Sequence, residues 1–213
     1  MLNNFIKSHR TGLISSKTLL WLYVKRDLPK LKGKLGIDLA GGGMKTKRFF
    51  STKKYISVDI DQKKLDDGKK EHPDAIAVND KIQIYMQNQY NENPDVLVCL
   101  QTFGTNTLFD HDEAFNVVKM MHNFLKPGGS MIFNAGEFLL DLDSLEKELT
   151  FFLKDKFKSI DKVFYGDIFS HKKKYLPWYI QLILAYIMYF MPFLGKIFGI
   201  KQKSVYFCCK EKL

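Results

Sequence analysis

The sequence predicts an α/β fold built on a mostly parallel sheet of seven strands, with helices on both faces. Short apolar runs alternate with helical segments along the chain, which is the pattern of parallel strands joined by crossover helices. The run at residues 94–100 is apolar after its first two residues, as expected for a strand buried on both faces. A glycine turn at residues 41–43 follows the first apolar run, at residues 35–39, and marks the end of a buried strand.

The chain opens with a segment that predicts a basic helix, within residues 1–34. This helix should end near Pro29, because proline cannot continue a helix. Its apolar cluster comprises Leu19, Leu20, Leu22, Tyr23 and Val24.

The later elements are bounded by turn-forming residues. Helices are expected at residues 112–125, before the turn at 126–129, and at residues 144–154. Asp143 and Glu146 are spaced as an N-cap and its partner for the second of these helices. Strands are expected at residues 35–39, 55–60, 75–78, 94–100, 130–134, 157–165 and 204–209.

Length and composition are those of one folded domain. The 213 residues are 46% apolar and 26% charged, which excludes disordered and low-complexity classes. The three cysteines, Cys99, Cys208 and Cys209, have the spacing of neither a disulfide framework nor a metal site. We therefore expect a cytoplasmic protein without a metal. Residues 1–10 lack the apolar core of a signal peptide.

The net charge of +10 is concentrated at the two ends of the chain. Residues 1–34 hold eight Lys or Arg against one Asp, and residues 168–213 hold eight Lys against one Glu, whereas residues 35–167 are slightly acidic. Basic ends favour an anionic partner. We expect a basic N-terminal helical segment, residues 1–34, followed by one domain at residues 35–213.

Two acids and the glycine turn predict a nucleotide site. Asp38 ends the first strand, and Asp59 ends the second, 21 residues later, where an acid can accept hydrogen bonds from ribose hydroxyls. Dinucleotides and S-adenosylmethionine both use this arrangement. The dinucleotide fingerprint fails, because Thr46 stands where its third glycine should be. Asp38 would also face a pyrophosphate unfavourably, but would suit the ammonium of a methionine moiety.

With these features the sequence resembles the class I, Rossmann-like S-adenosylmethionine-dependent methyltransferases, over residues 35–165 and the last strand. Residues 37–43 are similar to the first family motif and residues 58–61 to the second, while Ala40 and Met44 replace the outer glycines of the usual alternation. Residues 94–99 and 125–129 resemble the fourth-motif strand and the turn before strand five. The resemblance implies a three-layer fold and S-adenosylmethionine as cofactor. It implies that the cofactor-binding residues are Asp38, Ala40, Gly41, Gly42, Asp59, Ile60, Asp80 and Gln101.

A purely structural interpretation is also open for several of these residues. Asp38 could cap a helix that follows the turn, and Asp59 could be a turn acid at a strand end. Asn79 is placed as well as Asp80 to approach the adenine amino group.

A general base for methyl transfer should follow the fourth or fifth strand. His111, which is flanked by Asp110 and Asp112, is one candidate, because neighbouring acids raise the pKa of a histidine. Glu137, just after the fifth strand, is the other. Either side chain could instead be a solvated surface residue.

A long apolar segment precedes the last strand. Residues 175–195 carry no charge, while Lys172, Lys173 and Lys174 precede them and further lysines follow. The resemblance implies that the last strand returns to the sheet beside its predecessors, so this segment must start and end on the same face of a membrane, which a single bilayer span cannot do. Pro192 divides the segment into two predicted helices. We expect an interfacial insertion at residues 171–203 that binds an anionic membrane surface. The alternatives are a homodimer interface and a lid over the substrate pocket.

These observations predict an enzyme that transfers a methyl group from S-adenosylmethionine to a small or lipid-linked acceptor at the cytoplasmic face of the cell membrane. A saccharide or isoprenoid hydroxyl is the leading acceptor. The alternatives are an RNA methyltransferase that uses the basic ends, and a non-catalytic membrane-associated protein that retains the fold. Nucleic acid is disfavoured, because the aromatic residues lie within long aliphatic runs rather than in polar grooves.

Overall fold

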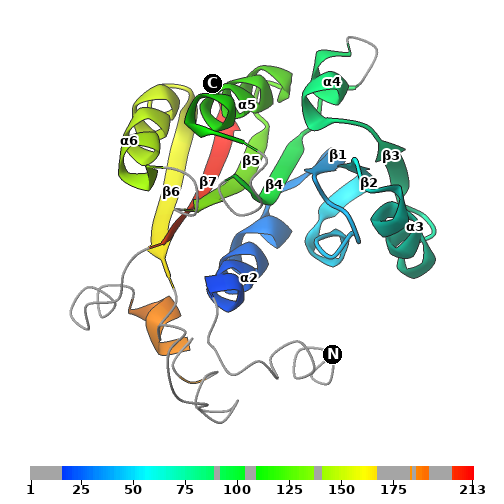
Figure 1. Cartoon of the computed structure of the whole chain (residues 1–213), viewed down its shortest axis with the longest axis horizontal. Helices are drawn as coiled ribbons and strands as arrows, with labels where there is room; N and C mark the ends of the chain where they lie inside the picture. Colours follow the sequence, from blue (N-terminus) through cyan, green and yellow to red (C-terminus); the bar gives the residue numbers. More distant parts are fainter. Residues whose placement is uncertain are drawn as a thin grey trace.

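The computed structural model describes residues 16–88, 92–103, 109–136, 141–166, 183, 186–191 and 203–213 (Figure 1). The predicted apolar insertion and Glu137 therefore fall wholly or largely outside the described residues.

The seven predicted strands form one sheet in the order β3-β2-β1-β4-β5-β7-β6. All neighbours pair in parallel except β7, which is antiparallel to both β5 and β6. The carboxyl ends of β1, β2, β4, β5 and β6 therefore meet at one edge of the sheet. The strands are β1 (Lys32–Leu39), β2 (Ser51–Asp59), β3 (Ile76–Asn79), β4 (Val96–Phe103), β5 (Ser130–Gly136), β6 (Phe157–Tyr165) and β7 (Ser204–Lys212).

Helices cover both faces of the sheet, so the predicted three-layer α/β fold is confirmed (Figure 1). Side chains of α4 (Ile82–Gln87), α5 (His111–Phe124) and α6 (Leu142–Leu153) fill the larger core cluster on one face. On the other face, α2 (Ser16–Asp27) packs over β4, β5 and β7, while α3 (Gln62–Glu71) packs beside β2. Two short 3-10 helices, η1 (Leu28–Lys30) and η2 (Lys47–Phe49), complete the described elements.

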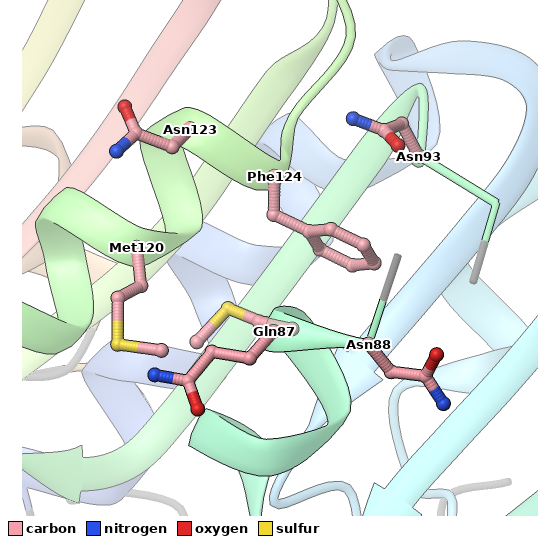
Figure 2. A pocket seen from close by; sticks show the side chains of 7 residues that line it. Gln87, Asn88, Asn93, Met120, Asn123 and Phe124 are labelled. Carbon is pink, nitrogen blue, oxygen red and sulfur yellow. The ribbon is translucent and has the colours of Figure 1, made fainter. Parts of the chain in front are cut away.

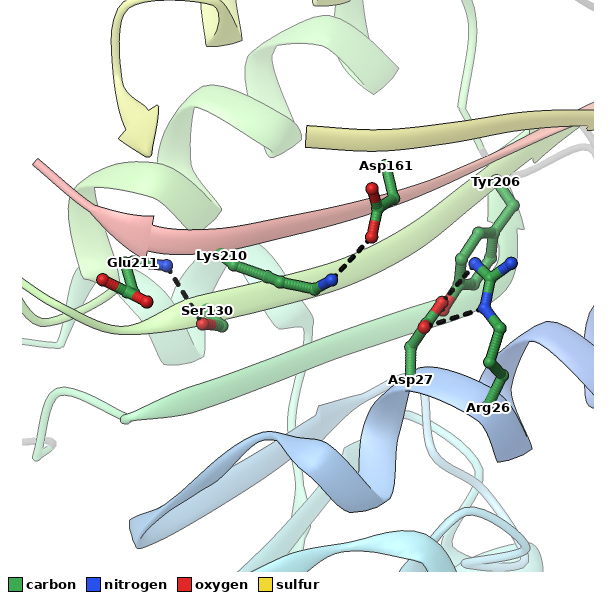
Figure 3. Close-up of polar contacts among 7 residues, drawn as sticks. All are labelled: Arg26, Asp27, Ser130, Asp161, Tyr206, Lys210 and Glu211. Atoms are coloured by element: carbon green, nitrogen blue, oxygen red, sulfur yellow. Dashed lines mark hydrogen bonds and ion pairs between the residues drawn. The ribbon is translucent and has the colours of Figure 1, made fainter. Parts of the chain in front are cut away.

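A buried acid ties α2 to the sheet. The side chain of Asp27 is 2% exposed and accepts hydrogen bonds from the Arg26 guanidinium and from the Tyr206 hydroxyl of β7, the latter at 3.1 Å (Figure 3). On the neighbouring strand pair, Lys210 Nζ lies 2.6 Å from Asp161 Oδ2. A buried carboxylate with charged and hydroxyl partners is stable only while those partners stay in place. The described part of the N-terminal segment is therefore an integral part of the fold.

The predicted elements correspond closely to the observed ones, with two corrections. The N-cap of α6 is Asp141, whose carboxylate accepts the Ser144 amide at 3.2 Å, and not Asp143, because the helix begins earlier, at the buried Leu142. The helix that Asp38 could have capped after the glycine turn is also absent, since residues 40–50 form turns and η2 only. Helices α3 and α4 were not expected.

All three cysteines are buried and free. In the part of the chain that the structure describes, no cluster of potential metal ligands occurs, and no helix has the length and apolarity needed to cross a bilayer.

Candidate cofactor site

The glycine turn keeps the backbone of an alternating-glycine motif, although two of its positions are not glycine. Ala40, Gly42 and Met44 have positive φ angles of 57°, 41° and 53°. A side chain in this left-handed region costs roughly 1–2 kcal/mol, so Ala40 and Met44 are strained positions. At Met44 the free-energy cost of the positive φ is offset by burial, because its side chain is fully buried among Tyr55, Leu65 and Ala75.

Glycine at position 41 is required by its neighbours. A Cβ atom there would lie 2.5 Å from Ser57 Oγ and 2.7 Å from Asp38 Cγ, both too close for a real contact. A Cβ at Gly43 would meet nothing within 4 Å, so the outer surface of the turn is open. The turn therefore packs tightly on the strand ends while leaving its backbone accessible to a ligand.

Asp59 joins the turn to the start of α3. Its Oδ2 accepts the Gly42 amide and its Oδ1 accepts the Asp61 amide, each at 2.9 Å. A carboxylate has about four acceptor positions, so two remain after these amide bonds. The next residue, Ile60, is an apolar side chain that is 60% exposed. An acid with free acceptor capacity beside an exposed apolar side chain suits a ribose joined to a flat base.

Asn79 and Asp80 both lie next to Asp59. The Asn79 side-chain amide and the Asp80 backbone amide each donate to the Asp59 carbonyl oxygen, at 3.1 and 3.2 Å. The Asp80 carboxylate accepts the amide of Lys81 at 2.7 Å. The structure thus brings both candidates for the adenine end to the same edge, and the choice between them stays open.

Gln101 occupies an irregularity at the carboxyl end of β4. Its φ is 57°, and the pairing register of β4 with β5 shifts between Cys99 and Phe103. The Gln101 backbone amide donates to the side-chain oxygen Oδ1 of Asn134 in β5 at 2.8 Å. Bulges of this kind often lie beside active sites, where they redirect side chains. Gln101 therefore reaches the same sheet edge as Asp38 and Asp59.

Asp38 lies beneath the turn. Its side chain is 2% exposed and accepts hydrogen bonds from the Thr46 hydroxyl and, at 3.0 Å, from the Tyr55 hydroxyl. Burial raises the pKa of Asp38 to about 7, and the neighbouring Asp59 adds to the rise, while the two hydroxyl donors oppose it. Its predicted contact with a methionine ammonium stays a prediction.

The buried Asp38 predicts that stability falls with rising pH. Its carboxyl has a pKa of about 7 in the native state against 3.8 in an unfolded chain, so the native state gains from protonation. This gain is complete below about pH 4 and is lost as the pH rises through 7, which lowers the free energy of unfolding by up to about 4 kcal/mol. The Asp38→Asn variant should lack this pH-dependent contribution to the free energy of unfolding. Urea unfolding of both proteins at pH 4 to 8 measures it, and equal pH slopes would contradict the assignment.

Of the two candidate bases, the structure describes His111. His111 begins α5, and its Nε2 lies 3.2 Å from Glu148 Oε1 of α6. Ser144 Oγ also donates to Glu148, at 3.3 Å. His111 is thus paired within the helical layer, and the site residues gathered around Asp59 come from the strand ends. Glu137 lies outside the described residues.

The sequence did not single out the two hydroxyl partners of Asp38. Thr46 was notable only for breaking the dinucleotide fingerprint, and Tyr55 only as the first residue of a strand. A periodicity signal exists for Tyr55, because it shares the face of β2 with Ser57 and Asp59, the face that the Asp38 side chain also occupies. Thr46 carries no comparable local signal.

A cavity of about 310 Å³ lies between the ends of α4 and α5 (Figure 2). It sits where β4 and β5 begin, which is the sheet edge opposite to the glycine turn. Amide, thioether and phenyl side chains line it, and none of them belongs to the predicted cofactor residues. They are Met86, Gln87, Asn88, Asn93, Met120, Asn123 and Phe124.

The chain resembles solved methyltransferase structures in fold. The plantazolicin methyltransferase BamL, in complex with a desmethylPZN analog and SAH, matches 98% of this chain and 89% of its own, with a TM-score of 0.58 and 12% identity. The N-methyltransferase NodS from Bradyrhizobium japonicum matches 92% and 93%, with a TM-score of 0.54 and 11% identity. No protein-family model and no curated protein matches the sequence. The chain thus has the Rossmann-like fold of class I methyltransferases.

Proposed function

We propose that this protein is an S-adenosylmethionine-dependent methyltransferase. The observation that carries the proposal is the hydrogen bond from the Gly42 amide to Asp59, which joins the glycine turn to the acid of β2 at the carboxyl edge of the sheet. Ligands of open α/β folds bind at this edge. The similarity in fold to BamL and BpumL, both solved with SAH, supports the same cofactor class.

The residues at this edge suit S-adenosylmethionine. Asp59 has acceptor positions left for the ribose hydroxyls, and the exposed Ile60 offers an apolar surface to adenine. Asp80 or Asn79 would face the adenine amino group, while Ala40, Gly41, Gly42 and Gln101 would surround the methionine moiety. The cofactor supplies a methyl group on a positively charged sulfur. The protein's task is to hold an acceptor in line with that methyl, because positioning gives most of the rate in such displacements.

An oxygen acceptor with a high pKa also needs a base near the carboxyl ends of β4 and β5. His111 and Glu137 remain the proposed candidates. The 3.2 Å contact with Glu148 would fix the orientation of the His111 ring.

We further propose that the insertion between β6 and β7 rests on an anionic membrane surface. Tyr165 and Ser204, which flank it, are paired in the sheet, and Ser204 is also paired with Gly136 at the carboxyl end of β5. The insertion thus starts and ends at the same edge as the glycine turn. The acceptor that suits this location is a small or lipid-linked molecule, with a saccharide or isoprenoid hydroxyl as the leading candidate.

Side chains of the described part of the insertion support a surface role. Tyr189 packs on Tyr23 of α2, with ring centroids 5.4 Å apart, and Met188 packs against the same core cluster. The opposite side of this short helix is apolar and exposed, with Phe190 at 72%. Apolar side chains turned outward and flanked in sequence by lysines suit a lipid headgroup boundary. The exposed set is Ile183, Tyr186, Ile187, Phe190 and Met191.

Transfer of labelled methyl from S-adenosylmethionine tests the activity and the acceptor class together. The purified protein is incubated with separate lipid, RNA and polypeptide fractions from cells, and label is counted in each. We expect label in the lipid fraction. Label confined to RNA or polypeptide would refute the acceptor class while leaving the enzyme class intact, and no incorporation into any fraction would count against both.

A further inference from the structure

We propose that Thr46 and Tyr55 are positioning residues of the cofactor turn, which act through the Asp38 carboxyl without touching the cofactor. The inference rests on the proposed function, because it concerns the turn assigned there to S-adenosylmethionine. It assigns a role to two hydroxyl groups that the sequence motifs leave unexplained.

The three side chains form a clasp across the turn. Asp38 stands before the turn at the end of β1, Thr46 stands eight residues later at its far end, and Tyr55 projects from β2. The Tyr55 hydroxyl donates to Asp38 Oδ2 at 3.0 Å, and the Thr46 hydroxyl donates to the same oxygen. The two hydroxyl oxygens are 3.4 Å apart. One carboxyl oxygen therefore joins both ends of the turn to the neighbouring strand.

The clasp is sealed from solvent. The exposed fractions of Asp38, Thr46 and Tyr55 are 2%, 4% and 6%. Water therefore cannot take the place of a lost hydroxyl, and a carboxyl left without its donor would be buried and unsatisfied. For the same reason these hydroxyls are not placed to contact the cofactor.

The turn needs such a constraint because no α-helix follows it. The chain continues from Met44 into η2 and then into β2, with Ala40 and Met44 both held at positive φ. Because no helix fixes the far end of the turn, side-chain contacts must hold its conformation. The burial of Met44 and the bond of Thr46 to Asp38 both anchor that side of the turn.

The clasp is linked to the ribose acid through one peptide. Gly41 lies so close to Asp38 that a Cβ would be 2.7 Å from the carboxyl carbon. The amide of the next residue, Gly42, donates to Asp59 Oδ2. A shift of the Asp38 carboxyl would therefore move the amide that orients Asp59. Loss of either hydroxyl should weaken cofactor binding from a distance.

The clasp should also make cofactor binding depend on pH. Four side chains surround Asp38: Thr46 of the turn, and Tyr55, Ser57 and Asp59 of β2. Cys99 of β4 lies in the core on the other face of the sheet but interacts electrostatically with Asp38. Of these groups only Asp59 is a second carboxyl. Tyr55 and Thr46 favour the ionised form of Asp38, because they donate to it. Cofactor affinity should therefore fall at low pH, where Asp38 becomes protonated, and we call this fall the acid limb. Removing one donor should move the acid limb to higher pH.

Isothermal titration of the full chain with S-adenosylhomocysteine between pH 6 and 9 tests the inference. Tyr55→Phe and Thr46→Val, which keep the shape of each side chain, should each weaken binding about tenfold at pH 7.5, or about 1.4 kcal/mol. Both should shift the acid limb upward. Thr46→Ser, which keeps the hydroxyl, should restore the wild-type affinity and pH profile. Tyr85→Phe, a buried tyrosine of α4 on the other sheet face, is the matched control.

The outcomes separate the inference from the proposed function. Wild-type affinity and an unshifted acid limb in both Tyr55→Phe and Thr46→Val would overturn the inference and leave the cofactor assignment in place. Equal losses in Thr46→Ser and Thr46→Val would also overturn it, because the hydroxyl would then not matter. Absence of binding by the folded wild-type protein would overturn the proposed function, and the inference with it.

Discussion

Asp59→Ala is expected to weaken binding of S-adenosylhomocysteine by about 100-fold. The substitution removes the acceptor for two ribose hydroxyls, and it leaves the Gly42 and Asp61 amides without their partner. Losing hydrogen bonds to a charged acceptor costs roughly 1.5–3 kcal/mol each, so a total near 3 kcal/mol is a conservative expectation. Titration calorimetry at pH 8 measures the change.

Two controls make the Asp59 result interpretable. Asp59→Asn keeps one acceptor oxygen and should give an intermediate loss. Asp66→Ala removes an exposed carboxylate from α3 and should leave the affinity unchanged. An Asp59→Ala protein that folds and binds within threefold of wild type would show that this acid is a structural turn residue and not a ribose ligand.

Charge placed on the exposed side of the insertion is expected to abolish membrane binding. In the double variant Ile187→Asp and Phe190→Asp, two outward apolar side chains are replaced by acids. Each apolar side chain contributes about 1.5–3 kcal/mol when buried, so membrane partitioning should fall by at least about 100-fold. Co-flotation with vesicles that contain phosphatidylglycerol measures it, and wild-type protein should float in low salt and less in high salt.

Phe151 provides the matched control for this experiment. It is an exposed phenylalanine, at 85%, on α6, which lies on the other face of the sheet from α2. Phe151→Asp should float like the wild type. Wild-type protein that stays with the soluble fraction at low salt would refute the membrane proposal, and dimer formation lost in the double variant would favour the homodimer alternative.

The strands were predictable because a strand buried on both faces appears in the sequence as a run of consecutive apolar residues. Residues 94–100 and 130–134 are apolar runs, and both are buried strands in the sheet. Helix α3 escaped prediction because its sequence is almost wholly polar and only Leu65 and Gly68 are buried. Its position depends on contacts with Ala75, just after the helix, and with Met44, which lies well before it in the sequence.

The candidate site was predictable to the extent that strand ends define it. Asp38 is the second-last residue of β1 and Asp59 the last residue of β2, and parallel pairing of the two strands brings their ends together. The clasp around Asp38 was not predictable, because the bond from Thr46 to Asp38 depends on the conformation of a turn that no α-helix follows. His111 was chosen for its acidic neighbours in sequence, whereas its observed partner is Glu148 of another helix.

Titration of the wild-type protein with S-adenosylmethionine, and with NAD as the alternative nucleotide, tests the central claim most directly. We expect saturable binding of one S-adenosylmethionine per chain and none of NAD, because Asp38 and the turn that Thr46 ends do not suit a pyrophosphate. A folded protein that gives no binding signal with S-adenosylmethionine, or that binds NAD in its place, would contradict the proposed cofactor.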